Sequence, residues 1–346
     1  MGSQHIDAVV AGGGGFIGGH LVADLVRQGL TVRSVDIKPF EDWYQVSPDG
    51  DNRQLDLSEM ASCQEAVSGA RYVYNLAADM GGMGFIENNK ALCMLTVLES
   101  THMLLAAQKE DVERFFFSSS ACVYAAGKQT DPSVTALKED DAYPAMPEDG
   151  YGWEKLFTER MCRHFSEDFG LPTRVARYHN VYGPQGTYQG GREKAPAAIC
   201  RKVALAPDGG EIEIWGDGKQ TRSFLYIDEC LEGTIRLMRS DFVGPVNIGS
   251  DEMVTVDKLV DLVASVAGKT IRKRHIDGPT GVRGRNSDNR LIGEKLSWSP
   301  STVLIDGLRP TYAWICSQVR RNARSGSEAL PVSAVAPKSK IIRAVQ

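Results

Sequence analysis

Cysteine is scarce in this chain, and the cysteines present are scattered. There are seven in 346 residues, and no two of them form a Cys-x-x-Cys pattern. An odd, dispersed set excludes a disulfide framework and the usual zinc sites. We therefore expect no metal, and we expect a reducing location such as the cytoplasm.

Long apolar runs and a strong net charge are also absent. No apolar run has the length of a membrane span, and the first five residues lack the hydrophobic core of a signal peptide. The formal net charge of −5 gives no electrostatic basis for binding nucleic acid. The length is sufficient to bury a large core, so we expect a soluble enzyme with neither a membrane nor a nucleic acid as partner.

Glycine is abundant near the N-terminus, where the pattern predicts a dinucleotide-binding unit. An apolar strand at 7–11 leads into a glycine-rich turn, and a helical pattern follows. Glycines at this spacing allow a tight turn, let the backbone approach a pyrophosphate and let the helix pack on the strand. The residues expected to bind the cofactor here are Gly12, Gly15, Phe16, Ile17 and Gly18.

The next predicted strand, 31–35, is followed directly by Asp36. A carboxylate at this point accepts a hydrogen bond from a ribose 2′-hydroxyl and repels a 2′-phosphate, so the sequence favours NAD over NADP. Asp56 is a candidate for the adenine side of the cofactor. The alternative for Asp56 is an ordinary solvated loop carboxylate.

Tyr151 and Lys155 are four residues apart and share one face of a predicted helix. We expect the lysine ammonium to lower the pKa of the phenol, so that Tyr151 serves as a base near neutral pH. Ser120, at the end of a predicted strand, can hydrogen-bond the same hydroxyl. These groups can take a proton from an alcohol whose hydride leaves for a nicotinamide. An isolated Tyr-x-x-x-Lys pattern is often only a pair of residues on the surface of a helix. The glycine-rich unit near the N-terminus favours the catalytic interpretation, because it would supply the dinucleotide.

Strands and helices alternate along the first half of the chain. Further strands are expected at 72–76, 114–117 and 174–178, and helices at 95–108 and 151–169. This alternation predicts an α/β fold with a doubly wound parallel (Rossmann) sheet, whose site lies at the carboxyl ends of the strands. We expect this NAD-binding domain at 1–180, rejoined by a segment near 224–249, a smaller α/β substrate domain at 181–320, and a disordered tail at 321–346.

Five long stretches carry a resemblance to a known family. They are residues 77–86, 119–122, 190–198, 215–224 and 281–289. Over residues 6–320 the chain resembles the extended short-chain dehydrogenase/reductase family of nucleotide-sugar enzymes, and most closely the branch that epimerises GDP-mannose at C3 and C5. The resemblance implies a homodimer that binds NAD and GDP-mannose. It implies transient oxidation at C4, inversion at C5 and C3 and re-reduction to GDP-L-galactose, with GDP-L-gulose formed by C5 inversion alone.

A ketone at C4 acidifies the hydrogens on C3 and C5, so inversion needs a base on one ring face and an acid on the other. Cys122 lies two residues past Ser120 and is expected at the same edge of the sheet. Lys194 would face the opposite side, and the resemblance assigns the same acid–base pair. Dehydratases of this family carry Asp-Glu where this chain has Ala121 and Cys122, so a dehydratase would lack its acid.

The remaining expected substrate contacts come mainly from the resemblance. Guanidinium and ammonium groups of Arg222, Arg283 and Lys202 suit a diphosphate. Gly81 is expected in a loop close to the sugar or, alternatively, in a flexible connection, and Asn180 caps a loop or contacts the sugar nucleotide. The full expected set is Gly81, Ser120, Ala121, Cys122, Asn180, Glu193, Lys194, Ala195, Lys202, Gln220, Thr221, Arg222 and Arg283.

Two other functions compete with this interpretation. A nucleotide-sugar 4-epimerase would need Ser120, Tyr151 and Lys155 but would have no use for Cys122 and Lys194. A non-catalytic dinucleotide-sensing regulator would keep the glycine-rich turn but would have no reason to keep Tyr151, Lys155 and Ser120 together.

Overall fold

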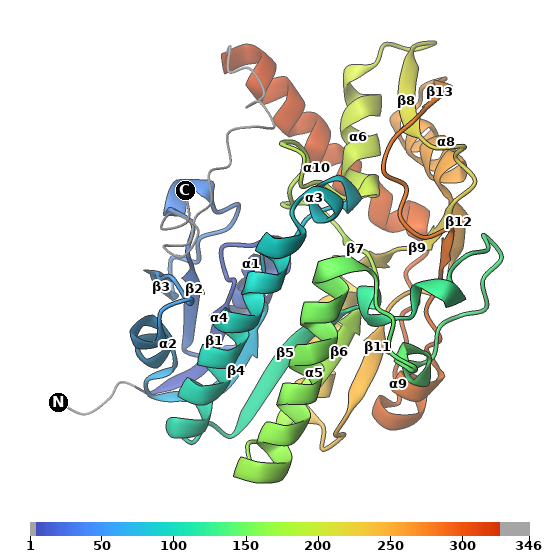
Figure 1. Cartoon of the computed structure of the whole chain (residues 1–346). Coiled ribbons are helices and arrows are strands. Elements are labelled where there is room, and N and C mark those ends of the chain that lie inside the picture. The colour runs from blue at the N-terminus through green and yellow to red at the C-terminus, as the bar shows by residue number, and fades with distance from the viewer. Residues whose placement is uncertain (1–4, 326–346) are drawn as a thin grey trace.

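The centre of the molecule is a seven-stranded parallel sheet, seen in a computed structural model that describes residues 5–325 (Figure 1). The strand order is β11-β6-β5-β4-β1-β2-β3, and every neighbouring pair is parallel. The strands are β1 (Ile6–Ala11), β2 (Val32–Asp36), β3 (Asp51–Gln54), β4 (Ala70–Asn75), β5 (Arg114–Ser120), β6 (Thr173–Tyr178) and β11 (Pro245–Ile248).

Helices cover both faces of this sheet, and apolar side chains of its central strands point to both of them. Val10 and Phe116 point toward α1 and α7, whereas Val9 and Phe117 point toward α2, α4 and α5. The predicted doubly wound fold is therefore confirmed. The covering helices are α1 (Phe16–Arg27), α2 (Met60–Val67), α4 (Lys90–Lys109), α5 (Asp149–Phe169) and α7 (Ile227–Arg239).

The strand order reverses between β1 and β4, which are hydrogen-bonded neighbours in the centre of the sheet. The loops that leave the carboxyl ends of β1 and β4 depart in opposite directions at such a point and leave a crevice between them. β5 lies next to β4 and runs parallel to it, so the loop that follows Ser120 begins at the same edge of the sheet. The fold thus brings the glycine-rich turn and Ser120 to one side of the sheet.

A second, smaller part lies beyond this edge, at the upper right of Figure 1. Its core packs α6, α8 and α10 with the parallel pair β8–β13. Its larger elements are α6 (Ala195–Leu205), β8 (Glu211–Trp215), α8 (Val256–Ala267), β13 (Arg272–Ile276) and α10 (Leu304–Ser325). Short strands lie at the junction: β7 (Val181–Tyr182), β9 (Thr221–Ser223), β10 (Leu225–Tyr226), β12 (Met253–Thr255) and β14 (Gly284–Arg285). The remaining short helices are η1 (Phe40–Asp42), α3 (Met83–Asn88), η2 (Ala121–Val123), η3 (Ala126–Lys128), η4 (Glu139–Ala142) and α9 (Arg290–Leu296).

The chain returns to the first part more often than the sequence suggests. Residues 224–249 supply α7 and β11, as expected, but α9 also packs there through Ile292. This second return lies inside the segment predicted to be the substrate domain. The tail prediction needs a correction as well, because α10 continues through residues 321–325. The rest of the predicted tail lies outside the described residues.

Helix α4 is long and apolar enough, by length and composition, to cross a membrane, contrary to the expectation that no segment qualifies. In the structure it packs against α5 and α2 beside the sheet. Buried residues such as Cys93, Met103 and Leu104 account for much of its apolar character. The core helix of a soluble protein passes the same test of length and composition, but only 39% of the apolar window of α4 is buried within the described chain.

Candidate active site

The glycine-rich turn after β1 lies at the switch point of the sheet and has no room for side chains. Gly12 has a φ of +83°, and a Cβ on it would lie 2.9 Å from the backbone nitrogen of Ala77. A Cβ on Gly18 would lie 2.1 Å from the carbonyl oxygen of Gly12. The turn ends at Gly15, which caps α1, and Phe16 is the first helical residue. The glycine-rich turn therefore leaves a concave backbone surface that side chains would otherwise fill, which we call the glycine cradle. It lies at the N-terminus of a helix, where a pyrophosphate binds favourably.

Asp36 ends β2 beside this turn and is mostly buried. Its carboxylate accepts a hydrogen bond from the backbone nitrogen of Lys38 at 3.0 Å, and Lys38 Nζ donates to the carbonyl oxygen of Gly14 at 2.5 Å. Asp56 accepts hydrogen bonds from the backbone nitrogen and hydroxyl of Ser58, which fix the turn before α2. The structure thus places Asp36 at the cofactor turn. The adenine role of Asp56 stays a prediction.

Ser120, Tyr151 and Lys155 come together between β5 and α5. The Ser120 side chain lies near enough to the Tyr151 hydroxyl to act against the rise in its pKa. Lys155 is fully buried, and its Nζ lies 5.6 Å from the centroid of the Tyr151 ring and 3.6 Å from Oε2 of Glu154. This ammonium has no hydrogen-bond partner among the described residues. A buried donor of this kind fits a ligand that carries hydroxyl acceptors, as the ribose of a dinucleotide does.

The expectation that Lys155 lowers the pKa of Tyr151 is wrong for this state of the site. The pKa of the phenol is raised well above its ordinary value, and the largest cause is burial. Nearby Cys122 and Glu154 raise it further, and the Ser120 side chain opposes them. Tyr151 is therefore held neutral in the free protein.

Cys122 lies in the short helix η2, directly after β5, and its thiol is buried beside Tyr151. The two side chains belong to one apolar cluster with Ile86 and Cys93. Burial raises the pKa of the Cys122 thiol, whereas the guanidinium of Arg285 lowers it. Nη1 of Arg285 lies 3.5 Å from the sulfur. Burial thus favours the protonated thiol, while the neighbouring Arg285 guanidinium favours the thiolate.

Lys194 caps the N-terminus of α6 and approaches the same interior space from the second part of the molecule. Burial lowers the pKa of its ammonium, and the electrostatic influence of Cys122 opposes this shift. The Cys122 thiol and the Lys194 amine therefore interact electrostatically across one site. This is the pair that the sequence analysis singled out.

The loop that carries Lys194 is packed tightly on the loop after β4. The backbone nitrogen of Gly82 donates to the carbonyl oxygen of Arg192 at 3.0 Å. A Cβ on Gly82 would lie 2.4 Å from the carbonyl oxygen of Glu193. A Cβ on Gly81 would lie 3.1 Å from Cα of Arg192. Gly81 is thus part of a fixed contact rather than a flexible connection, and the backbone that approaches it belongs to the Lys194 loop.

Strand β9 adds a buried cation to the site. Arg222 donates to the carbonyl oxygens of Thr221 and Thr280, and burial together with the charge of Arg285 lowers its pKa to about 10. Thr221 itself donates to the carbonyl oxygen of Pro132. Oε1 of buried Gln220 has no hydrogen-bond partner among the described residues. Of these three predicted residues, Thr221 and Arg222 donate their hydrogen bonds to protein carbonyl oxygens. Only Oε1 of Gln220 is left, within the described part of the chain, to accept a hydrogen bond from a ligand.

Two predicted cations are not placed with this cluster. Nζ of Lys202 donates to the carbonyl oxygen of Glu213 at 2.6 Å. Arg283 makes a bidentate pair with Asp217, with both distances 3.0 Å, on the surface. Both side chains are held by protein acceptors, so the structure gives no support to the diphosphate role expected for them.

The other predicted contacts lie around the site in supporting positions. Asn180 has a φ of 42° and donates to the carbonyl oxygen of Ser223, so it fixes the junction between β6 and β9. The Glu193 carboxylate accepts from the backbone nitrogen of Gly191 and pairs with Arg201. Ala121 and Ala195 are the first residues of η2 and α6. Direct contact of these residues with a sugar nucleotide stays a prediction.

Sequence reasoning missed three residues beside Cys122: Arg285, Glu148 and Gln129. The guanidinium of Arg285 contacts the sulfur, and Glu148 and Gln129 bind that guanidinium. The available signal was the stretch 281–289, in which two arginines alternate with glycine. The interpretation favoured Arg283, whereas Arg285 is the buried one.

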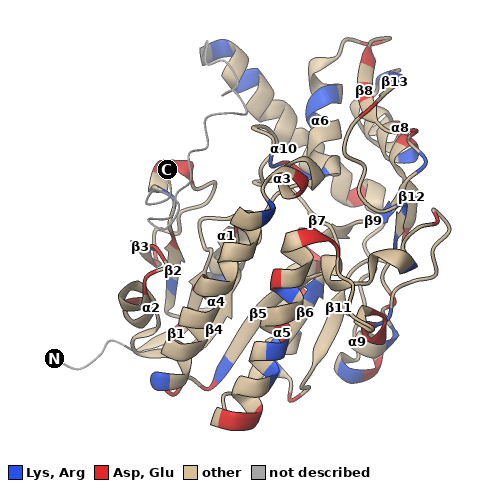
Figure 2. Cartoon of the chain, viewed as in Figure 1, with Lys and Arg blue, Asp and Glu red and all other residues tan. Residues whose placement is uncertain are grey.

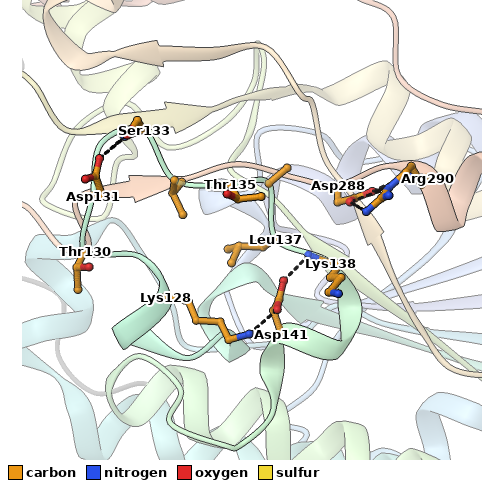
Figure 3. A pocket seen from close by; sticks show the side chains of 12 residues that line it. Lys128, Thr130, Asp131, Ser133, Thr135, Leu137, Lys138, Asp141, Asp288 and Arg290 are labelled. Carbon is orange, nitrogen blue, oxygen red and sulfur yellow. Dashed lines mark hydrogen bonds and ion pairs between the residues drawn. The ribbon is translucent and has the colours of Figure 1, made fainter.

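A separate surface pocket of about 650 Å³ shares no residue with this cluster. It lies between the segment 128–141 and residues 288 and 290, and four of its charged side chains form two ion pairs, Asp141 with Lys128 and Asp288 with Arg290 (Figure 3). We assign it no role in the chemistry. Within residues 5–325, no group of His, Cys, Asp and Glu side chains could hold a metal ion.

The family model for the NAD dependent epimerase/dehydratase family matches residues 8–249. The chain belongs to this family. Its cofactor is NAD, and the described residues fit NAD through the glycine cradle, the Asp36 carboxylate and the buried Lys155 ammonium, which donates no hydrogen bond to a described residue.

Similarity to members of the NAD dependent epimerase/dehydratase family extends over most of the chain. It is 47% identical to the GDP-mannose 3,5-epimerase of Arabidopsis thaliana, over 94% of this chain and 86% of the relative. It is 48% identical to GDP-mannose 3,5-epimerase 1 of Oryza sativa subsp. japonica, over 94% and 85%. The crystal structure of UDP-glucose 4-epimerase from Thermotoga maritima with UDP-glucose has a TM-score of 0.80 at 26% identity, over 91% of this chain and 100% of that one.

The position of Asp36 generates a prediction about cofactor choice. Asp36→Ala should weaken NAD and remove the repulsion of a 2′-phosphate, so that the preference for NAD over NADP falls by about tenfold or more. The measurement is the Kd of each dinucleotide for both proteins. A wild-type protein that already prefers NADP would contradict this role for Asp36.

Proposed function

We propose that this protein is a GDP-mannose 3,5-epimerase. The observation that carries the proposal is geometric: the Cys122 thiol clusters with Tyr151 and with Met80 and Phe85 of the segment after β4, and the backbone of the Lys194 loop packs on that same segment. This arrangement joins an alcohol-oxidising site to a separate acid–base pair. The choice of GDP-mannose as substrate is supported by the Arabidopsis and rice relatives rather than by any group that would select guanine.

The first chemical task falls to Tyr151. Its phenol takes the proton of the C4 hydroxyl, and the groups available to favour the phenolate once the ligands are bound are the Ser120 side chain and the Lys155 ammonium, whose Nζ lies 5.6 Å from the ring centroid. NAD, when bound, supplies the acceptor for the hydrogen that leaves C4 and returns it at the end. The neutral state of free Tyr151 matches a group that becomes a base only when the ligands are in place.

The second task falls to Cys122 and Lys194. With a ketone at C4, the hydrogens on C5 and C3 become acidic because their carbanions are enolates. One group removes a proton from one face of the ring and the other supplies a proton to the opposite face. Burial brings the thiol and the amine toward their neutral forms, and Arg285 beside the sulfur favours the thiolate when the proton leaves.

A nucleotide-sugar 4-epimerase is the second candidate. The likeness to the Thermotoga maritima enzyme supports it at the level of the fold, and Ser120, Tyr151 and Lys155 of this chain would suffice for that reaction. It leaves the buried pair of Cys122 and Lys194, with Arg285 against the sulfur, without a function. A dinucleotide-sensing regulator explains still less, because it has no use for any of these groups.

We also propose that the protein is a homodimer that pairs through α4 and α5. These helices lie side by side over one face of the sheet, and α4 shows almost no charge along its length (Figure 2). Met94, Leu95, Trp153 and Phe157 leave large apolar side chains exposed on the two helices. A second copy that buries this face would form a four-helix contact, and the same covering explains why α4 is apolar without a membrane.

Phe157 is the most exposed of the four side chains on this face, at 55%. Phe157→Asp should convert a dimer to a monomer, because the introduced carboxylate would be desolvated in the contact. Leu205→Asp, at an exposed position of α6, is the control and should stay dimeric. Light scattering at micromolar concentration measures the mass, and a monomeric wild-type protein would contradict the proposal.

Tyr151→Phe tests the redox task. The variant should keep its NAD and bind the sugar nucleotide, while turnover falls by about 10²–10⁴-fold because the base is gone. Tyr143→Phe, at an exposed position before α5, is the control and should keep wild-type turnover. A wild-type rate in Tyr151→Phe, or a need for stoichiometric added NAD, would contradict the mechanism.

Cys122→Ala and Lys194→Ala test the inversion task separately from oxidation. Cys122→Ala should still form the 4-keto sugar but should not exchange hydrogen at C5 or C3. Lys194→Ala should lose net inversion while keeping exchange on one face, since a single base can return the proton that it removed. Deuterium uptake from heavy water at each carbon, with product configuration, is the measurement. Wild-type inversion in both variants would remove the pair from the mechanism.

A further inference from the structure

The carboxylate of Glu148 is built into the surroundings of Cys122, although no step of the proposed reaction uses it. Glu148 is the residue that caps α5, and its backbone nitrogen donates to the carbonyl oxygen of Cys122 at 2.9 Å. Its Oε2 lies 2.5 Å from Nη2 of Arg285. The two side chains are only 11% and 5% exposed, so this is a buried ion pair.

Arg285 is held on three sides. Its Nε donates to Oε1 of Gln129 at 2.7 Å, its Nη2 donates to Glu148, and its Nη1 lies 3.5 Å from the Cys122 sulfur. Gln129 and Glu148 therefore act as two anchors that leave one corner of the guanidinium facing the thiol. The planar fork of an arginine makes this orientation rigid.

We propose that Glu148 is a positioning residue that holds Arg285 against Cys122 and at the same time offsets the charge of the guanidinium. The sulfur is then a thiol in the resting enzyme, yet it has a cation within reach when it loses its proton. This proposal rests on the proposed function, in which Cys122 must both take and give protons.

The electrostatics of the site give the direction of the effect. Burial raises the pKa of Cys122 most, Arg285 lowers it, and Glu148 raises it. The other polar or titratable groups that face the thiol are Ser120, Tyr151, Cys93 on α4, Lys194 at the start of α6 and Arg222 on β9. If the charge of Glu148 is removed, Arg285 is no longer compensated, so the pKa of Cys122 falls.

The test is the pH dependence of Cys122 alkylation by iodoacetamide, followed on the Cys122 peptide by mass spectrometry of the intact, NAD-containing protein. Only the thiolate reacts, so the midpoint of the rate reports the thiol pKa. Glu148→Gln keeps the shape and a hydrogen-bond acceptor but removes the charge, and the midpoint should move down by about one pH unit or more. Asp149→Asn is the matched control, because that neighbouring carboxylate pairs with Lys90 at 3.0 Å and should leave the midpoint unchanged.

A second variant keeps the proposal testable if Glu148→Gln does not fold. Gln129→Glu places a further carboxylate on Nε of Arg285, and the midpoint should move up. Shifts of opposite sign in these two variants support the proposal, whereas an unchanged midpoint in either folded variant overturns it. The alkylation is measured without sugar nucleotide. An unchanged midpoint would therefore overturn the role of Glu148 but not the proposed epimerase reaction. Conversely, if the protein catalysed another reaction, the expected shifts of the midpoint would be the same.

Discussion

The docking of the N-terminus of α5 onto the turn after β5 is the contact on which the site depends. The carbonyl oxygen of Cys122 accepts a hydrogen bond from the backbone nitrogen of Glu148, and a Cβ on Gly152 would lie 2.3 Å from that oxygen. Only glycine at position 152 allows this approach. Because the helix starts there, Tyr151 lies against Cys122 and Ser120, and Lys155 follows one turn later. The redox group and the thiol are thus placed by one backbone contact.

Burial then sets the resting chemistry of these groups. The pKa values of Tyr151 and Cys122 are raised and that of Lys194 is lowered, each mainly by loss of water, so all three are shifted toward their neutral forms. Arg285 and Arg222 retain charge beside them. The fixed cations suit the site to an anionic ligand. Until such a ligand binds, burial keeps Tyr151 and Cys122 in their protonated forms, in which neither can act as a base.

Local spacing made much of this predictable. The glycine-rich turn, Asp36 after β2, and the pair Tyr151 and Lys155 each depend on residues close in sequence, where helix and strand periods apply directly. The alternation of strands and helices likewise predicted the doubly wound sheet, but not its polar edge strand β3, whose four residues lack the apolar pattern of a buried strand.

The assignments that the structure leaves unsupported depend on contacts between distant segments. Arg283 and Arg285 are two residues apart and would share one face of a strand, so periodicity cannot choose between them; only the packing of Gln129 and Glu148 does. Lys202 lies on the same helix that Lys194 caps but is turned to the carbonyl oxygen of Glu213 on β8. The pKa of Tyr151 was mispredicted because spacing shows the neighbouring lysine but not the depth of burial.

The central claim is that one site both oxidises a sugar at C4 and inverts neighbouring carbons through solvent-exchanging groups. Proton NMR of GDP-mannose incubated with the wild-type protein in heavy water tests it most directly. The account predicts product that carries deuterium at C5 and C3 and protium at C4, because hydrogen at C4 is returned within the site. A product inverted at C4 alone, with protium at C3 and C5, would contradict it and leave a 4-epimerase.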